Sequence, residues 1–395
     1  MKRVCLSQVC PKPKMKLYLV AIEPSSDELG AELAKNLKAQ SSDITLAGIG
    51  GAAMRAEGLP SQMEIEGLAI VGITEALLKI HTIWDKLSEA CERIIESKAD
   101  AVVMIDSYGF MIRLARKLKK AGYQGRLIKY VAPQVWAMRP SRTKRMAKYF
   151  DALLAIHEFE PDWFTRDGLE SHYVGNAVFD TDYRAGDPQR LREQYKLGER
   201  PILAVFLGSR MGEIVRLSKP FTDAVQALQS QMPDLAVICP VSDSVAKEVG
   251  AQAGADPRMN DMILLPESAK LDAMACATAA LACSGTVTTQ LACAAVPTIV
   301  AYRMSPVTFV IVRYLFQPDY ISIVNIAADK ALMPEFVQSD VTGEVLAKAL
   351  SPYFTDTKKR ADTSDALLQQ TARMRGALAE TASARAARTI LSILT

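Results

Sequence analysis

The sequence predicts an α/β protein made of two domains, each built on a parallel β-sheet. Continuous apolar runs recur along the chain, as expected for strands that helices cover on both faces. Segments with leucines at helical spacing separate these runs. The alternation starts again near residue 200, and 395 residues is a natural length for two domains.

The first domain is predicted over residues 15–180. A helix over residues 25–40 follows the first strand and carries Leu29, Leu33 and Leu37 at helical spacing. The strands of this domain are expected at residues 16–23, 44–51, 99–106, 125–133, 151–158 and 171–176. We interpret residues 1–14 as an N-terminal tail, or as an over-extended start before Met15.

The second domain is predicted over residues 201–357, after a polar linker at residues 181–200. A helix is expected over residues 211–231, and the strands at residues 200–210, 234–240, 261–268, 277–284 and 296–303. The Ala-rich residues 358–395 predict one long amphipathic helix that crosses back, either packing across both domains or exchanging between the protomers of a homodimer. Two such domains that face each other bind ligands in a central cleft, outside the carboxyl ends of their strands.

Composition argues against several kinds of site. A net charge of +3 gives no reason to expect nucleic acid, and the seven cysteines and three histidines have no metal-ligand spacing. No dinucleotide or Walker loop occurs in the sequence, so we expect neither a metal nor a cofactor. The uncharged segment 273–302 is broken by polar residues and Pro297, which favours a buried strand–loop–helix–strand over a membrane span. We therefore expect a cytoplasmic protein that at most touches a membrane from outside.

Two turns of the second domain have the composition of anion sites. Gly208, Ser209 and Arg210 end a strand directly before a helix, and Glu213 lies in the first turn of that helix. The same place after another strand is taken by Ser284, Gly285 and Thr286. Helix N-termini and arginine favour anions, although ordinary turns use the same residues as caps. Two such turns in one domain favour a nucleoside diphosphate.

In the first domain, the apolar residues 101–105 deliver Asp106 into a turn. An acid at the end of a buried strand is either a catalytic base or a cap of the turn, and both interpretations stay open on this pattern.

Residues 130–150 of the same domain combine Trp136 with five cations, namely Arg139, Arg142, Lys144, Arg145 and Lys148. This segment is either a solvated helix face or the site of a phosphate-bearing or membrane-surface partner.

Residues 68–87 are unusually apolar for a surface helix. A stripe at helical spacing contains Ile73, Leu77, Ile80 and Trp84. The stripe is explained by core packing, but apolar residues outside it would also suit a lipid interface.

A set of longer motifs extends over nearly the whole chain from about residue 16. In order they are GIGGAAMRAEG, LAIVGITEAL, MIDS, YVAPQVWAMRP, LGSRMGEI, CSGT, AYRMSP, DYISIVN and MPEFVQ. Together they resemble lipid-A-disaccharide synthase, a family of inverting glycosyltransferases with the two-domain GT-B fold.

The resemblance implies a reaction in lipid A biosynthesis, part of lipopolysaccharide assembly. A diacylated glucosamine would pass from UDP to the 6-hydroxyl of 2,3-diacylglucosamine 1-phosphate, without a metal, at the inner face of the inner membrane. Asp106 matches the family's best candidate for the base, and Arg210 matches the arginine of its GSR motif. For the UDP-sugar the implied residues are Ser209, Glu213, Ser284, Gly285, Thr286, Gln290, Arg303 and Asn325. On the acceptor side the implied residues are Glu23, Ser25, Asp27, Trp136 and Arg139. The cationic segment at residues 130–150 could meet the acceptor phosphate. The apolar segment at residues 68–87 could enter the inner leaflet.

The chain departs from the family pattern at several positions. Ser26 replaces a glycine of the family pattern, and Tyr108 with Gly109 replaces its Pro-Asp pair. Asn176 replaces a histidine and Leu207 a proline. Gln290 replaces an acid and Val324 a second proline. The alternative to an active synthase is therefore a divergent or inactive GT-B relative that uses another UDP-sugar or binds a lipid or protein. A nucleotide-sugar epimerase of the same architecture is a further alternative, which the apolar segment 68–87 disfavours.

Overall fold

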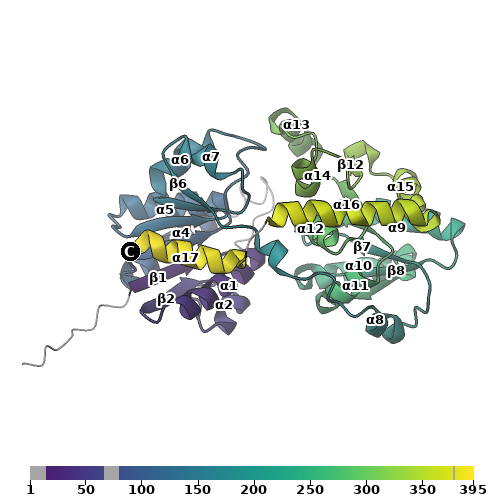
Figure 1. Ribbon diagram of the computed structural model, residues 1–395, viewed down its shortest axis with the longest axis horizontal. Coiled ribbons are helices and arrows are strands. Elements are labelled where there is room, and N and C mark those ends of the chain that lie inside the picture. The colour runs from purple at the N-terminus through teal and green to yellow at the C-terminus, as the bar shows by residue number, and fades with distance from the viewer. Residues whose placement is uncertain (1–14, 66–79, 377–378) are drawn as a thin grey trace, which may run out of the picture. The chain divides into compact units, whose positions relative to one another are not determined.

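The structure is a computed structural model that describes residues 15–65, 80–376 and 379–395. The chain forms two compact units (Figure 1), one comprising Met1–Ala177 with Ala379–Thr395 and the other comprising Val178–Leu378. Within the described residues, each unit contains one six-stranded sheet whose neighbouring strands are parallel. The predicted α/β class with two parallel-sheet domains is confirmed.

The sheet of the first unit has the strand order β2-β1-β3-β4-β5-β6. Its strands are β1 (Met15–Val20), β2 (Ile44–Ile49), β3 (Ala101–Ile105), β4 (Arg126–Tyr130), β5 (Ala152–Ala155) and β6 (Glu170–Tyr173). Its helices are α1 (Pro24–Gln40), α2 (Ala52–Ala56), α4 (Ile80–Ser97), α5 (Tyr108–Lys120), α6 (Arg142–Tyr149), α7 (Pro161–Thr165) and α17 (Ala382–Leu394).

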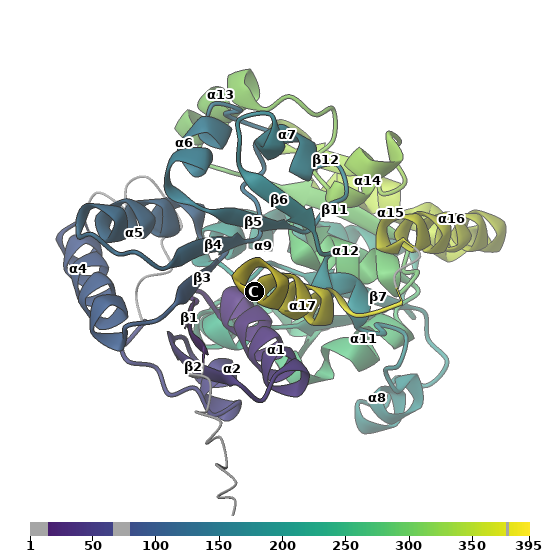
Figure 2. The ribbon, with the colours of Figure 1, turned by 60° about the vertical axis from the view of Figure 1, so that its left-hand side comes forward.

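Helices cover both faces of this sheet. Tyr18 and Val20 point into a core shared with α4 and α5, whereas Leu17 and Leu19 point into a core shared with α1 and α17. Figure 2 shows α17 beside α1, and the Gln40 side chain donates to the Ala384 carbonyl at 2.8 Å. Burial on both faces explains why β1 and β3 read as continuous apolar runs.

The sheet of the second unit has the strand order β12-β11-β10-β7-β8-β9. Its strands are β7 (Ile202–Phe206), β8 (Ala236–Pro240), β9 (Met262–Leu265), β10 (Ala279–Cys283), β11 (Thr298–Tyr302) and β12 (Glu335–Val337). Its helices are α8 (Pro188–Gln194), α9 (Met211–Gln231), α10 (Ala246–Ala255), α11 (Lys270–Cys276), α12 (Thr286–Cys293), α13 (Pro306–Leu315), α14 (Ile323–Ala328), α15 (Gly343–Thr355) and α16 (Thr357–Arg375). α9 and α15 share a core with one face of the sheet, and α8 and α11 share a core with the other.

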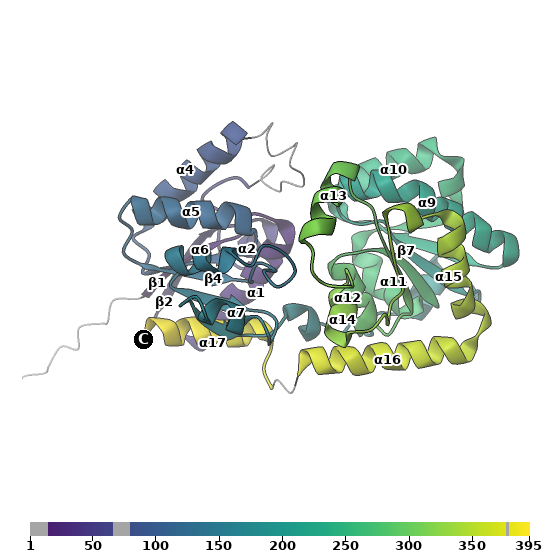
Figure 3. The ribbon, with the colours of Figure 1, turned by 90° about the horizontal axis from the view of Figure 1, so that it is seen from above.

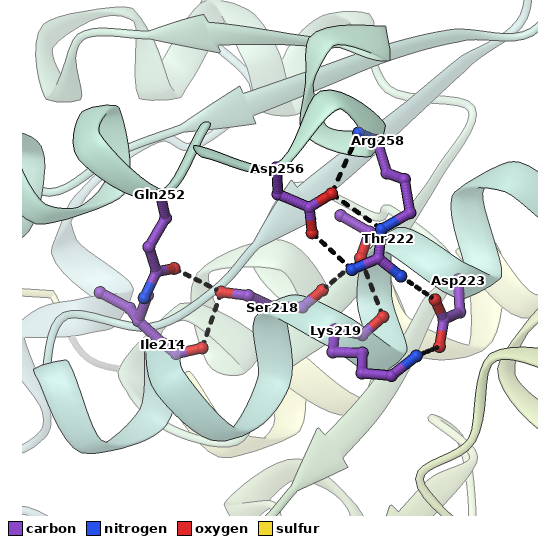
Figure 4. A network of polar contacts seen from close by, with 8 residues as sticks. All are labelled: Ile214, Ser218, Lys219, Thr222, Asp223, Gln252, Asp256 and Arg258. Carbon is purple, nitrogen blue, oxygen red and sulfur yellow. Dashed lines mark hydrogen bonds and ion pairs between the residues drawn. The ribbon is translucent and has the colours of Figure 1, made fainter. Parts of the chain in front are cut away.

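A polar network ties α9 to the α10–β9 connection on the surface of the second unit (Figure 4). The guanidinium of Arg258 bridges the carboxylates of Asp256 and Asp223, at 2.6 and 2.9 Å. One helical turn earlier, the Ser218 hydroxyl bonds Gln252 of α10 at 2.9 Å. The network fixes the outer face of α9, the helix that starts at the Gly208–Arg210 turn.

The C-terminal segment differs from the expectation of one long helix. Residues 358–395 form parts of two helices, α16 in the second unit and α17 in the first (Figure 3). Gly376 ends α16 with φ +67°, a left-handed conformation that glycine adopts without strain, and its N–H caps the Ala372 carbonyl. Gly376 therefore ends α16 before the chain reaches α17, and the two helices belong to different cores.

Residues 181–200 also differ from the expected linker. They contain α8, which packs on α11 within the second unit. Asp272 of α11 accepts hydrogen bonds from the Asp187 N–H at 2.8 Å and from Arg190 at 2.5 Å. The polar composition of the segment supplies these bonds, which is why it resembles a linker in the sequence.

Candidate functional site

Asp106 follows β3 in a strained turn at the carboxyl edge of the first sheet. Asp106 and Ser107 both have left-handed backbone conformations, with φ of 50° and 41°. The Asp106 N–H donates to the Tyr130 carbonyl at 2.9 Å, which ties the turn to the end of β4. Ser107 is the N-cap of α5, and the Asp106 carboxylate accepts no hydrogen bond from any residue that the structure describes. The carboxylate is half-buried and does not serve as a helix cap.

Lys129 lies beneath this turn and was missed in the sequence. Its side chain is 1% exposed, and its Nζ donates to the carbonyls of Tyr130 and Val131, each at 2.8 Å. Burial lowers the pKa of Lys129 to about 7, against the opposing attraction of the Asp106 charge. The Tyr130 carbonyl thus accepts from both the Lys129 ammonium and the Asp106 N–H, and it joins the end of β4 to the turn after β3. A lone lysine inside the apolar run 125–133 was the signal that could have revealed it.

Glu23, expected on the acceptor side, contacts the same turn. The Ser107 hydroxyl donates to Glu23 Oε1 at 2.7 Å. Ser26, which replaces a family glycine, is buried and bonds the Glu23 N–H and carbonyl at 3.0 and 2.8 Å. Ser25 is exposed. Ser26 thus forms part of the hydrogen-bonded N-terminus of α1, and this accommodates its departure from the family pattern.

The polar groups of Asp27 and Trp136 already form hydrogen bonds within the first unit. The Asp27 oxygens accept the N–H groups of Gly51, Ala53 and Met54 at 2.7–3.2 Å, which caps α2. The Trp136 indole donates to Glu160 at 3.2 Å. These bonds give both side chains a structural role, so contact with an acceptor is not needed to explain them.

Glu160 is itself almost fully buried. Its second oxygen accepts the N–H groups of Ile156 and His157 at 3.2 and 3.0 Å, and burial raises its pKa to about 7.

The cations of residues 139–148 converge on a cleft of about 710 Å³ within the first unit. Arg113 and Arg116 of α5 join them there, one helical turn apart. Tyr108 and Gly109, next to the Asp106 turn, line the same cleft. Arg139 therefore faces a concave cationic surface.

In the second unit, the Gly208–Arg210 turn joins β7 to α9. Gly208 has φ +107°, and a Cβ there would lie closer than 3.0 Å to Glu213 Oε2. Glu213 is largely buried, and burial raises its pKa although the Arg210 charge at 3.7 Å opposes this. Arg210 is the N-cap of α9 and is half exposed, and Ser209 is exposed. The Glu213 carboxylate accepts the backbone N–H groups of Ser209 and Arg210, so the turn presents the Arg210 side chain at a helix N-terminus.

The Ser284–Thr286 turn occupies the same edge of the sheet. β10 pairs directly with β7, so the helices that follow them, α12 and α9, start on neighbouring strands. Gly285 and Thr286 are exposed, no side chain caps α12, and nothing lies within 4 Å of a Cβ built on Gly285. The Cys283 thiol at the end of β10 donates to the Ser284 carbonyl at 3.7 Å. The two predicted anion turns are therefore neighbours.

Gln290, Arg303 and Asn325, the other residues expected at the UDP-sugar, differ in how far their polar groups are already hydrogen-bonded within the second unit. Gln290 donates to the Tyr183 hydroxyl at 3.3 Å, and its buried Oε1 has no hydrogen-bond partner among residues 15–65, 80–376 and 379–395. Arg303 donates to the carbonyls of Gln338 and Val341, which holds the segment after β12. Asn325 is fully buried, and its amide bonds Met333 and Glu335.

The apolar stripe is only partly within the described residues. Ile73 and Leu77 lie outside them, Ile80 begins α4, and Trp84 is 45% exposed. No helix in the described ranges has the length and apolarity needed to cross a membrane. In the same ranges, no three His, Cys, Asp or Glu side chains gather as a metal site requires.

Solved structures with the same fold include nucleotide-sugar enzymes. The chain is similar to a Staphylococcus aureus MnaA structure with UDP, at a TM-score of 0.67 and 12% identity, covering 96% of this chain and 97% of that one. It is also similar to the UDP-GlcNAc 2-epimerase of Neisseria meningitidis bound to UDP-GlcNAc, at a TM-score of 0.62 and 12% identity, covering 96% and 99%. At such identities the likeness establishes the fold alone.

Sequence relatives are much closer. The chain is 37% identical over 381 residues to a lipid-A-disaccharide synthase of Rhodospirillum centenum, covering 96% of this chain and 94% of the relative. It is 39% identical over 352 residues to that of Paramagnetospirillum magneticum, covering 88% and 90%. The family model described as lipid-A-disaccharide synthetase matches residues 17–390. This chain belongs to the lipid-A-disaccharide synthetase family.

Proposed function

We propose that Asp106 is the general base of this enzyme and that the Gly208–Arg210 and Ser284–Thr286 turns bind the UDP of its donor. Membership of the family makes the chain a glycosyltransferase of lipid A biosynthesis. The donor would be UDP-2,3-diacylglucosamine and the acceptor 2,3-diacylglucosamine 1-phosphate. The products would be lipid A disaccharide 1-phosphate and UDP.

The assignment of the base rests on the Asp106 carboxylate at the end of β3, which accepts no hydrogen bond from the part of the chain that the structure describes. The acceptor 6-hydroxyl must lose its proton as its oxygen attacks the anomeric carbon of the donor, and a carboxylate within hydrogen-bond reach accepts that proton. The Asp106 carboxylate forms no helix-capping hydrogen bond in the described chain that would compete with this role. The charge of the buried Lys129 side chain attracts the charge of the carboxylate. The new C–O bond forms opposite the bond to UDP, so the configuration at the anomeric carbon inverts. The electron pair of the broken bond leaves on the β-phosphate oxygen.

The leaving UDP gains negative charge, which two neighbouring helix N-termini and Arg210 would stabilise. Glu213 holds Arg210 at 3.7 Å and leaves it half exposed, so its guanidinium remains available. The buried Gln290 Oε1 lacks a donor, and a hydroxyl of the ribose or sugar could supply one. The UDP in the structurally similar Staphylococcus aureus protein supports a nucleotide role for this fold.

Acylated substrates are drawn from a membrane surface, and the exposed Trp84 on α4 is suited to such a surface. We include in the proposal a peripheral contact of the segment around Trp84 with the inner face of the inner membrane.

The test combines both substrates with purified protein and follows UDP release and the disaccharide. Asp106→Asn should lower kcat by about 10²- to 10⁴-fold and leave UDP binding intact. Asp162→Asn, at an exposed position of α7, is the matched control and should retain full activity. Full activity of Asp106→Asn would remove the base assignment. Folded wild-type protein that binds UDP but makes no disaccharide would contradict the reaction.

A further inference from the structure

We propose that the cationic cleft of the first unit is a phosphomonoester site that holds the 1-phosphate of the acceptor and thereby selects it. The cleft is lined by Arg113, Arg116, Arg139, Arg142, Lys144, Arg145 and Lys148, together with Tyr108, Gly109, Ile112, Ser141 and Tyr149. This inference rests on the proposed function, because the acceptor named there carries this phosphate.

The positive charge of the cleft is not balanced by ion pairs among the described residues. Its lining contains no acidic side chain. None of its seven cations forms an ion pair with an acid of the described residues. Arg142 lies 4.7 Å from the ring centre of Tyr108, and burial together with the charges of Arg139 and Arg145 lowers its pKa. A bound anion would relieve this repulsion, whereas an empty cleft leaves it in place.

The shape and composition of the cleft favour a phosphomonoester over a membrane surface. A polybasic patch for anionic lipid needs only exposed charge, but these cations surround a concave volume of about 710 Å³. Five of the seven are arginines, whose planar forks match phosphate oxygens in pairs. A terminal phosphate monoester carries up to two charges and three free oxygens, which suits several arginines at once.

The cleft reaches the Asp106 turn. Tyr108 and Gly109 line it two and three residues after Asp106, at the N-terminus of α5. Arg113 and Arg116 follow along the same helix, about 6 and 10 Å from Gly109 at 1.5 Å per residue. When the phosphate of an acceptor sugar binds these arginines, the sugar ring would extend toward Asp106 and present its 6-hydroxyl to that carboxylate. The Tyr108 hydroxyl is buried and has no hydrogen-bond partner in the described chain.

The first experiment measures binding alone, by titration calorimetry in saturating UDP so that the nucleotide site is occupied. The probes are glucosamine 1-phosphate and glucosamine. Wild type should bind the phosphorylated sugar at least tenfold more tightly than glucosamine, and Arg113→Gln/Arg145→Gln should lose that preference. Arg55→Gln, an exposed arginine of α2, is the control and should keep it. Equal binding of the two sugars by wild type, or an unchanged preference in the double variant, would overturn the proposal.

The second experiment separates the acceptor from the membrane. The same proteins are sedimented with phosphatidylglycerol and with phosphatidylcholine vesicles. The double variant should lose the phosphate preference and bind anionic vesicles as wild type does. Loss of vesicle binding with the sugar preference intact would identify a lipid site instead. Because calorimetry needs no turnover, phosphate recognition without disaccharide synthesis would contradict the proposed function and leave the phosphomonoester site itself standing.

Discussion

Replacing Gly208 by alanine tests the architecture of the UDP turn. The residue has φ +107°, and the new Cβ would lie closer than 3.0 Å to Glu213 Oε2 and 3.0 Å from Glu213 Cβ. The backbone strain costs about 1–3 kcal/mol and the overlap a similar amount, so we expect a loss of about 2–6 kcal/mol. At about 2–4 °C per kcal/mol for a unit of this size, Tm should fall by about 4–24 °C. UDP affinity should fall as well, because Glu213 holds Arg210.

Gly285→Ala is the matched variant on the neighbouring strand. Gly285 has an extended backbone, and no atom lies within 4 Å of its built Cβ, so Tm should stay within about 1 °C of wild type. The methyl group would nevertheless project at the uncapped start of α12, and we expect UDP to bind at least about tenfold more weakly, a loss of 1.4 kcal/mol. Scanning calorimetry and UDP titration measure the two effects separately. Full UDP affinity in Gly285→Ala would refute the assignment of this turn, and an unchanged Tm in Gly208→Ala would refute the steric argument.

Three further predictions concern the first unit. Glu160 has a folded pKa of about 7 against an ordinary 4.5, so its stabilising contribution is full below pH 4.5 and is lost as the pH rises toward 7; thermal unfolding should show this loss, on the order of 3 kcal/mol, and Glu160→Gln should lack it. Lys129 has a folded pKa of about 7 against an ordinary 10.5, so the free energy of unfolding should rise by up to about 1.4 kcal/mol per pH unit between those values, and Lys129→Met should not show the rise in the same scans. Asp27→Ala should destabilise the unit by about 1–2 kcal/mol through the lost α2 cap while the KM for the acceptor stays unchanged; a raised KM in folded protein would restore an acceptor-side role.

The strands were predictable because most are short apolar runs buried on both faces. All eleven expected strands are present, and α9 has the expected bounds Met211–Gln231. β12 was missed because Glu335–Val337 is three residues long and only partly buried, so it carries no distinctive pattern. Gly376 ends α16 and the Thr381 side chain caps α17, but the separation of the two helices also depends on the different cores that they join, which local composition does not encode.

The candidate site was predictable where function depends on a local motif. The Gly208–Arg210 turn was visible because glycine, arginine and a helix start are adjacent in sequence. The partners of Asp27 were not visible, because the N–H groups that it caps lie 24–27 residues away. The contribution of Arg113 to the cationic cleft was missed for the same reason, since it faces α6 from another helix. Pairings between elements of this kind depend on the packed sheet.

The return of α17 to the first unit constrains the order in which the protein can fold during synthesis. Ala386, Ala387 and Ile390 complete the core that α1 forms with the first sheet, and the Arg385 side chain bonds the Val174 carbonyl. A ribosome makes these residues only after the entire second unit, so the part of this face that α17 covers stays exposed beside α1 while Val178–Leu378 is being synthesised. The first unit therefore cannot complete its core before the second unit has been made. Its second unit can finish first, and until the last helix emerges the nascent protein exposes an apolar surface that chaperones would have to shield.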